Sequence, residues 1–257
     1  MNYLKEDPEL LTVPLESAAV IVPPPGSKEP QLSACRVATR LGGLLQLLAA
    51  KTGVEGAAVI AVWLVESGGR SFTQKKSPLR LEVHQLFDTW GKRTRQQFDL
   101  HFRFGGHNLQ PGQPWENQEF RTEETGEFHS VHHNQRSEYA ALTLAQVLAG
   151  AEDGLRCASI GGCQIMMNSF GSLGYSSAQE MYTAFQESER AQVLGFFDFC
   201  QNKLAPNAGD LLNYLRAKDW ANFAKYYNGP GQVAVYLAKL QSAYQAGVVA
   251  LRMKEAA

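Results

Sequence analysis

The chain has 257 residues, of which 44% are hydrophobic and 19% are charged. This length allows a substantial buried core, which excludes a miniprotein held together by disulfide bonds. The 24 Lys and Arg residues nearly balance the 25 Asp and Glu residues, so the formal net charge is -1. No overall charge draws the chain to nucleic acid or to an anionic membrane, and we expect no nucleic-acid partner.

The cysteines and histidines do not form a pattern typical of a metal site. The four cysteines are Cys35, Cys157, Cys163 and Cys200. They lack the spacing of a C-x-x-C motif or of a zinc finger. His132 and His133 are adjacent, so their side chains diverge, and no third ligand has suitable spacing. We therefore expect buried free thiols, no metal and no cofactor.

Residues 1–30 differ in composition from the rest of the chain. They hold six of the 11 prolines and several acidic side chains, where a secretory signal would need a basic region and an apolar region. We expect synthesis in the cytoplasm without a signal peptide. We also expect a proline-rich arm over residues 1–30, dispensable for chemistry, followed by one folded domain over residues 31–257.

From residue 31 onwards, apolar residues recur with helical spacing. The pattern predicts a helix that begins at Gln31 and a second over residues 54–67, which is too short to span a membrane. Further helices are expected over residues 137–148, 159–170, 177–189, 191–204, 209–217, 220–227 and 232–250. Residues 70–135 contain turn signals and many aromatic residues, which favour short strands and long loops. The predicted class is mainly α (α+β) with a small irregular β insertion.

The sharpest local feature is the segment Val65-Glu66-Ser67-Gly68-Gly69-Arg70. It places a carboxyl group at the C-terminal end of an apolar helix, where burial and the helix dipole both disfavour the charged form. A glutamate in this position suits a general acid near neutral pH. From the spacing alone, a glutamate simply solvated at the helix end is the alternative.

Two further segments complete an ordered set with the first. They are Ser159-Ile160-Gly161-Gly162-Cys163-Gln164-Ile165-Met166 and Tyr227-Asn228-Gly229-Pro230-Gly231. In this order, the three segments resemble the lysozyme-like superfamily of peptidoglycan-cleaving enzymes. The segment Leu81-Glu82-Val83-His84-Gln85-Leu86-Phe87 is similar to one in the phage-type N-acetylmuramidase family. The resemblance to that family covers about residues 54–244.

The resemblance implies a lysozyme-like catalytic domain that cleaves the β-1,4 bond between N-acetylmuramic acid and N-acetylglucosamine. Glu66 would be the general acid and Glu82 the second carboxylate, with Asp88 and Asp99 as poorer candidates. Such carboxylates lie about 5 to 5.5 Å apart in retaining enzymes and roughly 6.5 to 9.5 Å apart in inverting ones. The implied substrate-binding residues are Ser159, Gln164, Tyr227, Asn228 and His84.

Two other functions stay open at this point. A lytic transglycosylase needs a single carboxylate, because the hydroxyl group of muramic acid attacks in place of water; Glu82 facing Glu66 would favour hydrolysis. The second alternative is a non-catalytic subunit that binds the cell wall or serves in particle assembly. It is motivated by Ile160 and Cys163, which stand where the family usually has Trp and Phe. Action at the cell wall would follow release as an endolysin, or carriage on a phage tail or contractile injection particle docked through residues 1–30.

Overall fold

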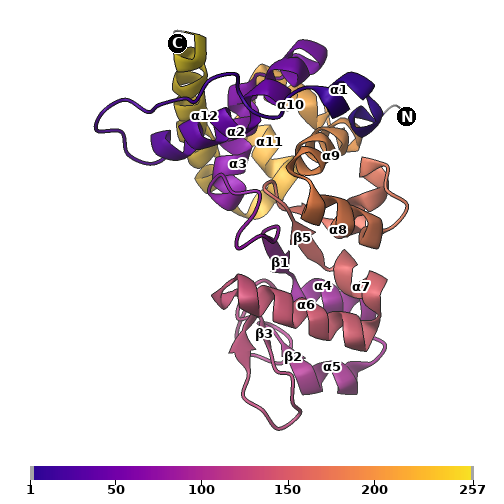
Figure 1. Cartoon of the computed structure of the whole chain (residues 1–257). Helices are drawn as coiled ribbons and strands as arrows, with labels where there is room; N and C mark the ends of the chain where they lie inside the picture. Colours follow the sequence, from indigo (N-terminus) through magenta and orange to yellow (C-terminus); the bar gives the residue numbers. More distant parts are fainter. Residues whose placement is uncertain (1–2, 256–257) are drawn as a thin grey trace. The chain divides into compact units, whose positions relative to one another are not determined.

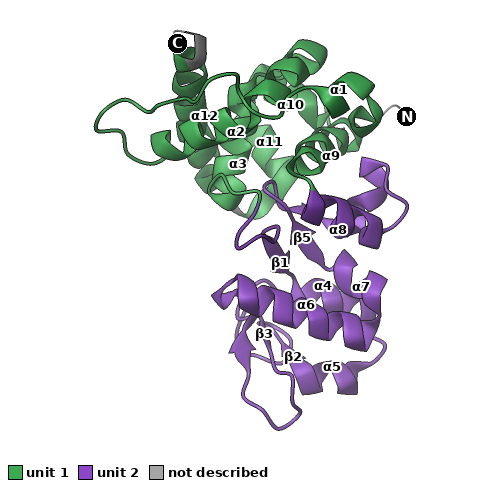
Figure 2. Cartoon of the chain, in the orientation of Figure 1, with its two compact units in different colours: residues 1–71, 188–257 green, residues 72–187 purple. Residues whose placement is uncertain are grey.

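The computed structural model describes residues 3–255. The chain divides into two compact units (Figure 2): the first combines residues up to 71 with those from 188 onwards, and the second comprises residues 72–187. The chain leaves the first unit after Ser71 and returns to it at Ser188.

Three helices pack together in the first unit (Figure 1). They are α2 (Gln31–Thr52), α3 (Gly56–Ser67) and α12 (Val233–Glu255). Every residue of α3 from Gly56 to Trp63 is buried, as expected for a helix that is apolar all round. Gly247 of α12 allows the close approach to α3, since a Cβ there would lie 3.0 Å from the carbonyl oxygen of Ala57. α3 is therefore the central helix of this unit.

Further helices and two short strands complete the first unit. They are α9 (Glu189–Asn202), the strands β7 (Leu204–Ala205) and β8 (Gly209–Asp210), α10 (Leu211–Ala217) and α11 (Trp220–Asn228). Ser188, Asp210 and Asp219 cap the three helices, because each side chain accepts a hydrogen bond from the backbone N–H three residues later. These caps fix where α9, α10 and α11 begin.

The N-terminal segment is folded onto the first unit. It contains a 3-10 turn (Leu4–Glu6) and α1 (Pro8–Thr12), and the side chain of Leu10 is fully buried. Farther along, the N–H of Ile21 donates to the hydroxyl group of Thr39 in α2 at 2.9 Å. Residues 3–22 thus differ from the expected free arm.

Two polar side chains of α9 account for this difference. Asp198 is fully buried and accepts hydrogen bonds from the N–H groups of Leu4 at 2.6 Å and Lys5 at 3.1 Å. The guanidinium group of Arg190 donates to the carbonyl oxygens of Leu10 and Val13. Because α9 supplies these partners, the backbone of the segment is satisfied without a core of its own.

The second unit contains two small antiparallel sheets. In one, β5 (Ala158–Ile160) lies between β1 (Leu79–Leu81) and β6 (Ile165–Met166). In the other, β3 (Glu119–Phe120) lies between β2 (Phe102–Arg103) and β4 (His129–Ser130). The helices are α4 (Val83–Leu86), α5 (Arg95–His101), α6 (Gln135–Ala149), α7 (Ala151–Arg156) and α8 (Ala178–Glu187).

The mainly α class with small β elements is confirmed, whereas the helix expected over residues 159–170 is wrong. Strands β5 and β6 occupy the first half of that range, and a 3-10 helix (Met167–Leu173) follows. Gly161 and Gln164 adopt left-handed backbone angles, with φ of +86° and +51°, which reverse the chain between the two strands. Pairing of β5 with the distant β1 then outweighs the apolar helical pattern.

The four cysteines are free and buried, as expected. Burial raises the pKa of the Cys157 thiol to about 11, which keeps it protonated and poorly nucleophilic at neutral pH. Across residues 3–255, no helix combines the length and the apolar character needed to cross a membrane.

Candidate active site

Glu66 lies in the last turn of α3, in the first unit. The helix stops directly after it because Gly68 and Gly69 adopt φ of +62° and +81°, a region that glycine enters at little cost. Their N–H groups donate to the carbonyl oxygens of Leu64 and Trp63 at 3.0 and 2.9 Å. The glycine pair therefore ends a buried helix at the point where a carboxyl group can reach its surface.

The carboxyl group of Glu66 is half-buried, and this burial raises its pKa to about 7. Two groups of the first unit oppose the rise. Nδ2 of Asn228 donates a hydrogen bond to Oε1 of Glu66 at 3.1 Å, and the charge of Lys239 in α12 attracts the ionised form. Glu66 therefore keeps a substantial protonated fraction near neutral pH and has a proton to donate.

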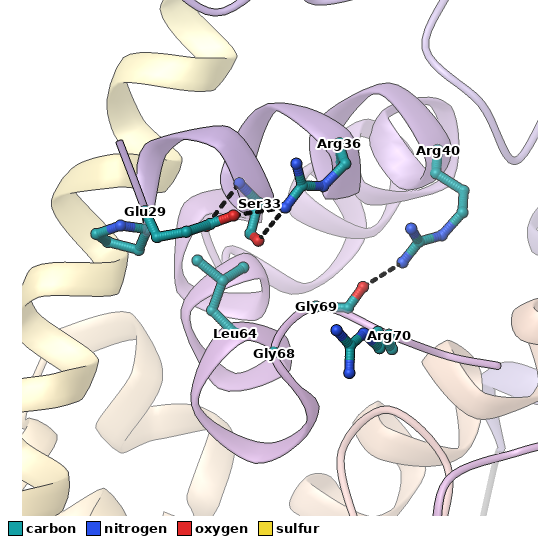
Figure 3. A pocket seen from close by; sticks show the side chains of 9 residues that line it. Glu29, Ser33, Arg36, Arg40, Leu64, Gly68, Gly69 and Arg70 are labelled. Atoms are coloured by element: carbon teal, nitrogen blue, oxygen red, sulfur yellow. Dashed lines mark hydrogen bonds and ion pairs between the residues drawn. The ribbon is translucent and has the colours of Figure 1, made fainter. Parts of the chain in front are cut away.

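A hollow of about 720 Å³ lies beside the end of α3 (Figure 3). It is lined by Glu29, Pro30, Ser33, Arg36, Arg40, Leu64, Gly68, Gly69 and Arg70. Nη2 of Arg40 donates to the carbonyl oxygen of Gly69 at 2.7 Å, and its Nε donates to Glu189 at 2.6 Å. Leu64 and Glu66 are about 200° apart around α3. Glu66 is not among the residues that line this hollow, and Arg40 holds Gly69 in place.

Tyr227 immediately precedes Asn228 in α11 and lies in an aromatic cluster. Its ring centroid is 5.0 Å from that of Phe223, 5.7 Å from that of Phe199 and 6.0 Å from that of Phe196. This cluster anchors the C-terminal end of α11, from which Asn228 reaches Glu66. Asn228, one of the binding residues that the resemblance implies, therefore forms a hydrogen bond with Glu66.

Glu82 directly follows β1 in the second unit. Its Oε1 accepts a hydrogen bond from Nε of Arg80 at 2.8 Å, and its Oε2 accepts one from Nε2 of Gln118 at 2.8 Å. Gln118 is 2% exposed, and its side-chain oxygen accepts the N–H of Val83. Two donors thus fix the orientation of a carboxylate that keeps part of its surface open to solvent.

His84 lies beside Glu82, with Nδ1 at 3.5 Å from Oε2 of the carboxylate. Burial lowers the pKa of His84, which leaves its ring neutral at neutral pH, although the charge of Glu82 acts in the opposite direction. His132 instead contacts Glu138 at 2.8 Å, and Glu138 also accepts the N–H of Leu81 in β1. In the part of the chain that the structure describes, no group of three His, Cys, Asp or Glu side chains could hold a metal ion.

Ser159 and Gln164 lie together in the β5–β6 hairpin. The hydroxyl group of Ser159 donates to Oε1 of Gln164 at 3.1 Å. Nε2 of Gln164 donates to the carbonyl oxygens of Gly161 at 2.8 Å and Pro78 at 3.1 Å. These bonds join the hairpin to the start of β1, so both side chains have a structural role in the second unit.

The structure therefore groups predicted residues in pairs: Glu66 with Asn228 in the first unit, and Glu82 with His84 and Ser159 with Gln164 in the second. It also adds residues that sequence reasoning missed. Gln118 holds Glu82 from 36 residues away, and Lys239 acts on Glu66 from α12. Neither belongs to a recognisable motif, because each contributes through its place in the fold.

Comparison with solved structures finds a similar fold. The chain is similar to the crystal structure of a Burkholderia AP3 phage endolysin, with a TM-score of 0.56 and 24% identity. The match covers 88% of this chain and 75% of that chain. No curated protein matches the chain.

The match to a family of N-acetylmuramidases defines the class of the protein as a glycoside hydrolase, on a mainly α fold similar to that of the phage endolysin. The model of the Muramidase family, described as N-acetylmuramidase, matches residues 55–247. The chain belongs to this family, whose substrate is peptidoglycan, and the resemblance found in the sequence is confirmed.

Proposed function

We propose that the chain hydrolyses the β-1,4 bond between N-acetylmuramic acid and N-acetylglucosamine, with Glu66 as the general acid. The observation that supports this proposal best is the raised pKa of Glu66, about 7, at the end of a buried helix. Cleavage of a glycosidic bond expels a poor alkoxide leaving group, which must receive a proton as the bond breaks. A carboxyl group that is still protonated near pH 7 can supply that proton.

Glu82 is our candidate for the second carboxylate. Arg80 and Gln118 leave it with fixed geometry and with remaining lone pairs to accept a proton from water or to face the developing positive charge on the sugar. His84 is assigned a positioning role, because its neutral ring lies against Oε2 of the same carboxylate. Ser159, Gln164 and Tyr227 remain proposed contacts to the sugar.

The natural setting that we infer is lysis of the cell wall by an endolysin. Residues 3–22 support this over carriage on a phage tail or contractile injection particle, since Asp198 and Arg190 already bind that segment within the chain. The proposal therefore assigns these residues to the stability of the catalytic fold.

Asn228→Ala is expected to move the alkaline limb of the pH–rate profile to higher pH. The hydrogen bond from Asn228 stabilises ionised Glu66, so its loss raises the pKa of Glu66 further. A general acid is active while protonated, and activity then persists to higher pH. The measurement is kcat/KM on solubilised glycan between pH 5 and 9, with Asn168→Ala as a control on an exposed asparagine. A limb that stays in place or moves to lower pH would contradict the proposed role of Glu66.

Glu82→Gln is expected to lower the rate of hydrolysis about 10- to 100-fold, because the amide cannot accept a proton from water. The products of the unmodified chain test the reaction type directly. Hydrolysis leaves reducing muramic acid ends, whereas transglycosylation leaves anhydro-muramic acid ends that are lighter by one water molecule. Anhydro ends in the mass spectrum, together with full activity of Glu82→Gln, would replace hydrolysis by transglycosylation.

A further inference from the structure

Trp115 lies at the surface of the second unit with 58% of its area exposed. It is the one aromatic residue among the large exposed hydrophobic side chains of the described residues. The other tryptophans are Trp63, Trp90 and Trp220, which are 0%, 7% and 6% exposed. An indole ring in water leaves a large flat apolar surface uncovered, which is unfavourable unless a ligand covers it.

The loop that carries Trp115 is tightly built. The N–H of Gly105 donates to the carbonyl oxygen of Glu116 at 2.9 Å, and the N–H of Glu116 donates to that of Gln113 at 2.9 Å. The Glu116 carboxylate also accepts the N–H of Gln113 at 3.0 Å. A Cβ at Gly105 would lie 2.6 Å from the carbonyl oxygen of Gln113, so the two sides of the loop are in direct contact. The backbone that carries the exposed indole is therefore fixed before any ligand binds.

The same loop is joined to Glu82. The carbonyl oxygen of Trp115 accepts a hydrogen bond from Nε2 of Gln118 at 3.4 Å, and the same nitrogen donates to Glu82. The Arg80 side chain, which is 45% exposed, donates to the other oxygen of Glu82. The buried amide of Gln118 thus connects the loop of Trp115 to the polar groups of Glu82 and Arg80. A flat apolar ring beside fixed polar groups is a combination suited to binding sugars.

We propose that Trp115 is the stacking platform of a saccharide subsite in the second unit, and that its ligand is the pyranose ring of an N-acetylhexosamine. The proposal rests on the proposed function for the choice of a glycan as ligand. The axial C–H groups of such a ring form an apolar face that covers the indole, while its hydroxyl and acetamido groups meet Arg80 and Glu82 at the edge. Because the loop backbone is fixed and a tryptophan side chain has two torsion angles, little conformational entropy is lost on binding.

The test uses soluble N-acetylglucosamine tetramer and tryptophan fluorescence. Acrylamide quenches exposed indoles, so most of the quenching in the intact chain comes from Trp115. The tetramer is expected to protect the intact chain from quenching and to give no further protection in Trp115→Phe. By calorimetry, Trp115→Ala should weaken tetramer binding about tenfold and Trp115→Phe by less. Leu204→Ala removes another exposed apolar side chain and should bind as the intact chain does.

Kinetics on peptidoglycan separate this inference from the proposed function. Trp115→Ala is expected to raise KM about tenfold with little change in kcat, since the indole contacts a sugar and not the reacting bond. An intact chain that cleaves peptidoglycan but shows no protection by the tetramer, with an unchanged KM in Trp115→Ala, would overturn the saccharide subsite alone. An intact chain that cleaves nothing would overturn the proposed function, whereas protection of Trp115 by the tetramer would still support the subsite.

Discussion

Glu66→Gln is expected to lower the rate of glycan cleavage by at least about 100-fold, and up to about 10,000-fold, while the fold is retained. Glutamine has the shape of the protonated carboxyl group but has no proton to transfer. The buried segment of α3 before Glu66 is unaffected by the change, so the helix end should keep its position. Clearing of a peptidoglycan gel and release of reducing ends from purified sacculi both measure the effect.

Glu55→Gln is the matched control for this experiment. It makes the same substitution just before the same helix, where Glu55 is an exposed N-cap residue that pairs with Lys218. This variant should cleave peptidoglycan at nearly the rate of the intact chain. If Glu66→Gln cleared the peptidoglycan gel as well as Glu55→Gln does, Glu66 would have no part in the mechanism.

Glu66→Gln should also change how the stability of the fold depends on pH. The pKa of Glu66 is raised to about 7 in the folded state, so between about pH 4.5 and 7 the unfolded chain ionises first, and this costs the fold stability that stays lost at higher pH. Below the unfolded pKa near 4.5 this cost is absent. Glu66→Gln is therefore expected to melt at a higher temperature than the intact chain at pH 8 and at nearly the same temperature at pH 4.5. Equal melting temperatures at pH 8 would show that the pKa is not raised.

Deletion of residues 1–22 is expected to lower the melting temperature by about 10 °C. The deletion uncovers the site that Leu10 fills and leaves the buried Asp198 and the partly exposed Arg190 without their backbone partners. Loss of partners for buried charged groups costs about 3 to 5 kcal/mol, and 1 kcal/mol shifts the melting temperature of a chain of this size by about 2 to 4 °C. Thermal melts followed by circular dichroism measure the change.

Cleavage well below the melting temperature distinguishes a structural role from a catalytic one. Glu66 and Asn228 lie outside the deleted segment, so the truncated chain should still cleave peptidoglycan at 15 °C. Asp198→Ala is the point-mutant counterpart and should reproduce part of the destabilisation by removing the acceptor for Leu4 and Lys5. A truncated chain that melts with the full chain would show that residues 1–22 are a detachable arm.

Local pattern was sufficient for most of the helices. The stripe from Gln31 predicted α2, and the apolar run closed by Gly68 and Gly69 predicted α3 and the place of Glu66 at its end. These features depend on neighbours within one or two turns, so the residues that determine them are adjacent in the sequence. Residues 159–170 were predicted wrongly because their strand pairing depends on β1, about 80 residues earlier.

The sequence by itself therefore determined the class of fold, the family and the candidate acid, since each depends on local spacing or on an ordered set of motifs. Only the tertiary structure decided what surrounds the acid and what holds the second carboxylate. Asn228 reaches Glu66 across 162 residues, and Gln118 joins Glu82 to the loop of Trp115. Asp198 likewise binds the N-terminal segment from 194 residues away. Burial and long-range hydrogen bonds arise from packing, and no local pattern in the chain specifies them.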